Sequence, residues 1–170
     1  QFPADDFAIL DGGRSNIGIE STIIDVRSPK GYQIIRRGVI NEQMIFKKTG
    51  LRPALLQDTP TLKAPGQLNT HYQPEKKLLY TSELNEALKF CNQFASESSL
   101  FHFSDLPVPP ACTAYRFASE IGTCAYEFYY QVRLADTSNV RYIVMELPPD
   151  FAEWLAIKDR ILKAGSLLIV

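Results

Sequence analysis

The residues DGGRSNIGIESTIIDV (11–26), followed after a turn by YQIIRRG (32–38), carry the strongest structural signal in this chain. Isoleucine and valine recur through residues 19–26, and residues 32–37 form a second short run, so the pattern predicts two strands. Between them, Ser-Pro-Lys-Gly at residues 28–31 is typical of a turn. We therefore expect one compact, hairpin-like unit.

This unit presents Ser21, Thr22 and Arg36 together. A guanidinium can direct two N–H donors at phosphate or carboxylate oxygens, and hydroxyls add further donors, so the trio suits an anionic, phosphate-bearing ligand. The alternative stays open, because Ser and Thr are common in strands and an exposed Arg at a strand end is often only solvated. Glu20 is interpreted as structural, and Gly12, Gly13 and Gly18 are expected to serve backbone geometry, since glycine adopts positive φ without steric cost.

A second motif, APGQLNTHYQP, occupies residues 64–74. It lies in a segment, residues 51–75, that has no clear period and holds four prolines, which block both helices and interior strands. The segment is too long for an ordinary connection, so it is either disordered or functional. A spacer whose His71 and Tyr72 pack against either domain is the alternative to a functional loop.

The rest of the chain predicts an α/β fold. Asn41 and Gly50 fit the two ends of a short helix that precedes the proline-rich segment. Ser82 and Asp150 are expected to cap later helices. The expected strands are 78–80, 99–104, 115–118, 142–147 and a final apolar run at 167–170, and they alternate with helices over 84–95, 121–135 and 150–164. This alternation favours parallel pairing in a layered sheet.

Composition narrows the function. The 170 residues carry 18 basic and 19 acidic side chains, a net charge of −1, which gives little basis for gripping a nucleic-acid backbone. No apolar run approaches the length of a membrane span, so no membrane association is expected. Three cysteines without close spacing suit a reducing compartment, and we expect a cytoplasmic protein. The start at Gln1, close to an apolar run, suggests a chain cut from a longer one.

Together the two motifs resemble the long, two-domain form of threonylcarbamoyl-AMP synthase, a group of YrdC-like enzymes. Further likeness lies in IRRG at residues 35–38 and in AIKDRILKA at residues 156–164. The resemblance implies a strand-rich tail of an α+β YrdC-like catalytic domain at residues 1–52, a linker or lid loop at 53–75, and an accessory, Rossmann-like domain at 76–170. The last is expected to be a three-layer α/β sheet domain with mostly parallel strands.

The resemblance also implies a chemistry. Such enzymes join L-threonine, bicarbonate and ATP, with Mg²⁺ on the phosphates, and pass the product to tRNA-modifying proteins. It assigns Ser21, Thr22 and Arg36 to the nucleotide pocket, although Arg37 stands where the family usually has Pro. The expected lid comprises Pro65, Gly66, Gln67, His71 and Tyr72, with Thr70 at a position where many members carry Arg or Ser.

Other features of the family are missing. Its upstream Lys-x-Arg and Ser-x-Asn motifs do not occur before the Asp-Gly-Gly string, so we name no catalytic residue and expect the chain alone to be inactive. His71 and His102, far apart in sequence, do not indicate a metal site. Two alternatives remain. One is a non-catalytic α/β module that binds a nucleotide or a protein, and the other is an RNA-binding translation factor, against which the near-neutral charge counts.

Overall fold

Five parallel strands form the main sheet of the computed structural model, which describes residues 8, 10–13, 15–27, 29, 31–54, 73–105, 107–108 and 112–169. In spatial order the strands are β5 (Thr113–Arg116), β4 (Ser98–His102), β6 (Tyr142–Glu146), β3 (Lys77–Thr81) and β7 (Ser166–Leu167). Every neighbouring pair is parallel. The predicted α/β fold with mostly parallel strands is therefore confirmed.

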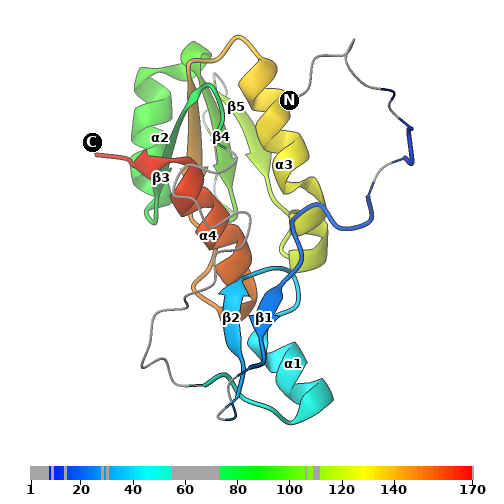
Figure 1. Ribbon diagram of the computed structural model, residues 1–170. Helices are drawn as coiled ribbons and strands as arrows, with labels where there is room; N and C mark the ends of the chain where they lie inside the picture. Colours follow the sequence, from blue (N-terminus) through cyan, green and yellow to red (C-terminus); the bar gives the residue numbers. More distant parts are fainter. Residues whose placement is uncertain are drawn as a thin grey trace.

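Helices cover both faces of this sheet (Figure 1). Helix α2 (Leu84–Gln93) packs on one face, in a cluster that includes Leu100 and Val144. Helices α3 (Ile121–Thr137) and α4 (Leu155–Ala164) pack on the other, where Phe101 and Ile143 point. Successive strand residues thus enter opposite cores, as the period of two requires.

A smaller unit precedes the sheet. Strands β1 (Ile23–Asp25) and β2 (Gln33–Arg36) pair antiparallel, which confirms the predicted hairpin-like arrangement. Helix α1 (Glu42–Thr49) follows, with the Asn41 side chain accepting a hydrogen bond from the Met44 backbone N–H over 2.9 Å. Gly50 ends the helix with a φ of 70°, a conformation that glycine adopts without steric cost.

Three local predictions are wrong. Strand β1 is shorter than the predicted 19–26, because Ile19 is buried in the core beside α3 and α4 rather than extending the hairpin. Ser82 caps no helix, since α2 begins after Glu83 without a side-chain cap. Asp150 does not cap α4, which follows a 3-10 turn at Ala152–Trp154, and its carboxylate pairs with a lysine instead.

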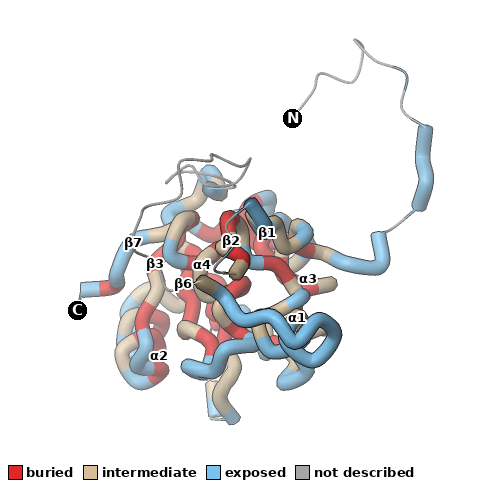
Figure 2. Tube along the Cα trace, turned by 60° about the horizontal axis from the view of Figure 1, so that its bottom comes forward, coloured by how far each residue is buried: buried red, intermediate tan, exposed pale blue. Residues whose placement is uncertain are grey.

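The small unit lies against the α/β domain (Figures 1 and 2). Ile19, only 4% exposed, and the partly buried Val39 belong to the same apolar cluster as Phe128 and Ile157 of the two nearby helices. The 3-10 turn Ala95–Glu97 leads into β4 on the far side of the domain. Within the described residues, no helix is both long and apolar enough to cross a membrane.

Candidate functional site

Ser21 and Arg36, predicted as partners, lie together in the small unit. The Arg36 guanidinium donates from Nε to the Ser21 carbonyl oxygen over 3.0 Å and from Nη2 to Ser21 Oγ over 3.1 Å. The register of β1 and β2 causes this approach, because Ile23 is the residue opposite Arg36. Ser21 is exposed and Arg36 is partly buried, so the pair sits at the surface with its charge held in one orientation.

Thr22 has a different environment. Its hydroxyl donates to the Ile40 carbonyl oxygen over 2.7 Å and accepts from the Gly38 backbone N–H over 3.1 Å. A threonine hydroxyl has one proton, so in this geometry none is left for a ligand. Gly38 fits here because a Cβ at this position would lie 2.4 Å from the Thr22 backbone nitrogen. Thr22 therefore fixes the 38–40 turn next to Arg36.

An ion pair between Arg160 and Glu20, which the sequence did not indicate, holds the residues next to Ser21 and Arg36. Arg160 of α4 is 5% exposed and donates from Nε to Glu20 Oε2 over 3.0 Å. Its Nη2 donates to the Arg37 carbonyl oxygen over 2.8 Å. Glu20 precedes Ser21 and Arg37 follows Arg36, so one guanidinium holds the chain next to each member of the pair.

The charge of Arg160 is well compensated. Its Nη1 lies 2.7 Å from Asp159 Oδ2, and Lys163 lies 2.9 Å from the same oxygen. Burial is the largest single influence and lowers the pKa of Arg160, but the combined effect of Glu20, Tyr129 and Asp159 outweighs it, so the net pKa is raised. The Tyr129 hydroxyl donates to Glu20 Oε2 over 3.2 Å, and burial, followed by the negative charge of Glu20, raises the pKa of Tyr129. Arg160 therefore keeps its proton and its positive charge, and the Tyr129 hydroxyl stays neutral.

The predicted lid residues Pro65, Gly66, Gln67, His71 and Tyr72, and also Thr70, lie outside the described residues. The described residues resume at Gln73. Gln73 and Pro74 line a cavity of about 770 Å³ together with Tyr129 and Arg133 of α3. Arg133 lies 3.4 Å from Asp136, as their i, i+3 spacing predicts. The end of the predicted lid segment thus lies next to the helix that supplies Tyr129.

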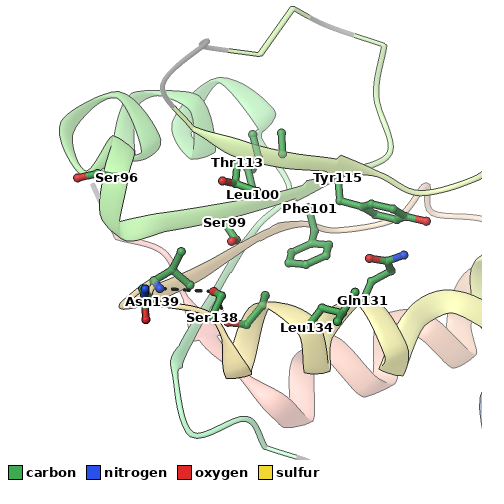
Figure 3. Close-up of a pocket in the computed structure, with 13 residues that line it drawn as sticks. Ser96, Ser99, Leu100, Phe101, Thr113, Tyr115, Gln131, Leu134, Ser138 and Asn139 are labelled. Carbon is green, nitrogen blue, oxygen red and sulfur yellow. Dashed lines mark hydrogen bonds between the residues drawn. The ribbon is translucent and has the colours of Figure 1, made fainter.

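A second cavity, of about 430 Å³, lies between strands β4 and β5 and the last turns of α3 (Figure 3). Phe101, Tyr115 and Leu134 form its apolar surface, and Gln131 and Ser138 add polar groups. The Tyr115 hydroxyl donates to Glu127 Oε2 over 2.6 Å. None of the described residues that line this cavity carries a formal charge, so it offers no charged group for phosphate chemistry.

The described residues also lack a cluster of side chains that could bind a metal ion. Within the part of the chain that the structure describes, no three His, Cys, Asp or Glu residues gather in a group able to hold a metal ion. Glu20, the carboxylate closest in sequence to Ser21, is already engaged with Arg160 and Tyr129.

The sequence of this chain is similar to one family of known proteins. A family model described as "Threonylcarbamoyl-AMP synthase, C-terminal domain" matches residues 34–166. Threonylcarbamoyl-AMP synthase of Pyrococcus abyssi is 24% identical over 171 residues, which cover 95% of this chain and 50% of that protein. The Bacillus subtilis enzyme is 24% identical over 168 residues, which cover 93% of this chain and 48% of that protein. The chain thus spans about half the length of these relatives.

A solved structure agrees with this match. The crystal structure of P. abyssi Sua5 complexed with L-threonine superposes with a TM-score of 0.73 at 20% sequence identity, over 94% of this chain and 50% of that one. At this identity the superposition establishes the shared fold. The matched family model covers the second strand of the small unit and nearly all of the α/β domain. The chain belongs to the family of threonylcarbamoyl-AMP synthase C-terminal domains.

Proposed function

We propose that this chain is the C-terminal part of an L-threonylcarbamoyladenylate synthase, which makes threonylcarbamoyl-AMP from L-threonine, bicarbonate and ATP for tRNA modification in the cytoplasm. The family match supports the reaction class. The observation that carries the proposal for this chain's own residues is the hydrogen-bonded Ser21–Arg36 pair. A guanidinium held at the surface in one orientation suits a phosphate group.

The reaction needs such donors. The carbamate formed from threonine and bicarbonate attacks the α-phosphate of ATP, pyrophosphate leaves, and a mixed anhydride remains. Negative charge gathers on the phosphate oxygens, so donors already in position lower the barrier without reorganising. Arg36 would supply the positive charge and Ser21 a hydroxyl, while Thr22 would fix the neighbouring turn. Mg²⁺ enters this proposal only as part of the MgATP substrate.

The lid belongs to the same proposal. Pro65, Gly66, Gln67, His71 and Tyr72 would cover the nucleotide, and prolines would lower the entropy lost on closure. A closed site would also exclude water from the fragile carbamate. The product would pass to tRNA-modifying proteins, and direct binding of this chain to nucleic acid would be weak, given the net charge of −1.

The chain by itself should have little or no activity, because the family's Lys-x-Arg and Ser-x-Asn motifs do not occur before its Asp-Gly-Gly string. Pyrophosphate release with all three substrates and magnesium tests this. The purified 170-residue chain should show only background turnover, whereas the complete product of its gene should release pyrophosphate only when threonine, bicarbonate and ATP are all present.

Two results would contradict the proposal. Turnover by the chain alone, at the rate of the complete gene product, would show that the adenylation site is not shared with upstream residues. A gene whose coding sequence carries neither upstream motif, and whose product releases no pyrophosphate, would favour the non-catalytic α/β module instead.

A further inference from the structure

The connections of the main sheet create an opening at its carboxyl edge. Strand β3 connects through α2 to β4, passing across β6 on one face. Strand β6 connects through α4 to β7, passing across β3 on the other face. The chain therefore leaves the neighbouring strands β3 and β6 in opposite directions. In open α/β sheets, ligands bind in the crevice outside the carboxyl ends of the strands at such a reversal.

A cavity of about 480 Å³ lies at this place. We call it the carboxyl-edge pocket. Its lining comes from the end of strand β6, from the segments that follow strands β3, β4 and β6, and from helix α4. The lining residues are Ser82, Phe103, Ser104, Glu146, Leu147, Pro148, Pro149, Asp150 and Lys158. Its volume falls within the range of about 300–1,000 Å³ that is usual for small-molecule sites. Ser21 and Arg36 do not line it, so it is separate from the proposed nucleotide site.

A buried carboxylate forms part of the wall. Glu146 is 5% exposed, and its Oε2 accepts from the backbone N–H groups of Phe103 and Ser104 over 2.6 and 2.9 Å. Its Oε1 accepts from the Ser104 hydroxyl. A carboxylate has about four lone-pair positions, so one on Oε1 is left for a further donor. The three bonds hold Glu146 rigidly, and the remaining position can bind a ligand N–H.

A cation and a second carboxylate complete the pocket. Lys158 Nζ donates to Asp150 Oδ1 over 2.8 Å, with side chains that are 28% and 83% exposed. An ammonium group has three donors, so two remain on Lys158 beyond this bond. The pocket thus holds one positive and two negative groups. A phosphate would meet both carboxylates, and a simple amine would meet Lys158, so neither matches all three charges.

We propose that the carboxyl-edge pocket binds an α-amino acid with an aliphatic side chain. The ligand carboxylate would bind Lys158, and the ligand ammonium would bind Asp150 and the open lone pair of Glu146. The ion pair between Lys158 and Asp150 would thereby be replaced by two ion pairs with the ligand, one at Lys158 and one at Asp150. The apolar wall of Phe103, Leu147 and the two prolines, which have no N–H to desolvate, would contact the side chain.

Nuclear magnetic resonance tests this on the whole 170-residue chain, with L-leucine as the probe. Titration to about 10 mM, enough to detect a millimolar Kd, should give saturable shifts at the backbone amides of Ser104, Leu147 and Asp150. Two analogues of the same shape, each with one charge removed, separate charge recognition from apolar contact. We expect 3-methylbutylamine and 4-methylpentanoate to bind at least about tenfold more weakly, equivalent to about 1.4 kcal/mol.

Variants locate the binding. Lys158→Gln should weaken L-leucine binding about tenfold, and Lys89→Gln, which removes an exposed charge from α2, should leave it unchanged. The dispersion of each variant's amide spectrum reports whether the fold is intact. Equal binding of the three probes, shifts confined to other parts of the chain, no saturable shift, or an unchanged affinity in a folded Lys158→Gln variant would each overturn the proposal.

Discussion

Arg160 and Glu20, separated by 140 positions in the sequence, form an ion pair of 3.0 Å with side chains only 5% and 16% exposed. The pair joins helix α4 to the segment that carries Ser21. Arg160 also donates to the Arg37 carbonyl oxygen, next to Arg36. The α/β domain therefore holds the proposed phosphate-binding residues in place.

Removing Arg160 should strongly destabilise the chain. Arg160→Met leaves the Glu20 carboxylate buried with Tyr129 as its remaining donor among these contacts, and losing one partner of a buried pair costs about 3 kcal/mol. Urea unfolding followed by circular dichroism measures the change. Arg141→Met is the matched control, because the Arg141–Glu97 pair is 3.8 Å apart and 70% and 49% exposed. Its loss should cost at most about 1 kcal/mol.

A double variant tests the cause. Glu20→Gln combined with Arg160→Met removes both charges, so it should be less destabilising than the sum of the two single changes. Strict additivity, or equal costs for the Arg160 and Arg141 variants, would mean that the ion pair does not join the two parts of the chain.

Local signals predicted most of the secondary structure. Asn41 and Gly50 bound α1 as expected, because a cap depends only on residues a few positions away. The apolar stripe of α3 was equally clear, since Phe128, Val132 and Ala135 all face the core. Ser82 and Asp150 failed as caps: α2 begins after Glu83 without a side-chain cap, and the Asp150 carboxylate pairs with Lys158, eight positions later.

Long-range contacts could not be predicted in this way. The hairpin-like unit indicated that Ser21 and Arg36 would meet, because turn and strand patterns fix a local pairing. Nothing in the spacing connects Glu20 with Arg160, since their approach depends on how two units pack. Gly18 shows the same limit. Of the three glycines expected to serve backbone geometry, Gly13 has positive φ but Gly12 and Gly18 do not, and Gly18 is required for close packing instead.

Gly18→Ala should therefore be more harmful than a change at a neighbouring glycine. A Cβ on Gly18 would lie 2.3 Å from the carbonyl oxygens of Ala125 and Tyr126 on α3, so the small unit or the helix must move. Such overpacking costs about 1–3 kcal/mol. Gly12→Ala is the control, since a Cβ there meets no atom within 4 Å, and it should change stability by less than about 0.5 kcal/mol. Equal unfolding midpoints for the two variants would contradict the packing argument.

Arg36→Lys tests the proposed phosphate contact in the complete gene product. Lysine keeps the charge but cannot reproduce the planar arrangement of donors that Arg36 directs toward Ser21. Pyrophosphate release should fall at least about tenfold, equivalent to about 1.4 kcal/mol of transition-state stabilisation. Arg27→Lys serves as the control, because Arg27 pairs with Asp25 on the same hairpin and is 67% exposed. If both variants keep full activity, Arg36 has no role in ATP handling.

Tyr115 should make the chain sensitive to alkali. Burial, together with the hydrogen bond to Glu127, raises the pKa of Tyr115 from 10.0 to about 12. An unfolded tyrosine loses its proton near pH ~10, so the stability that depends on neutral Tyr115 is fully present below that pH. It is lost as pH rises through the folded-state pKa, between pH 10.0 and about 12.

Tyr115→Phe removes this titration, so its unfolding free energy should decline less steeply with pH across that window than that of the unaltered chain. Urea unfolding at several alkaline pH values measures both slopes. Tyr130→Phe, at a position 52% exposed on α3, should keep the steeper slope. If the unfolding free energies of the Tyr115 variant and the unaltered chain decline equally with pH, the Tyr115 hydroxyl has the same pKa in the folded chain as in the unfolded one.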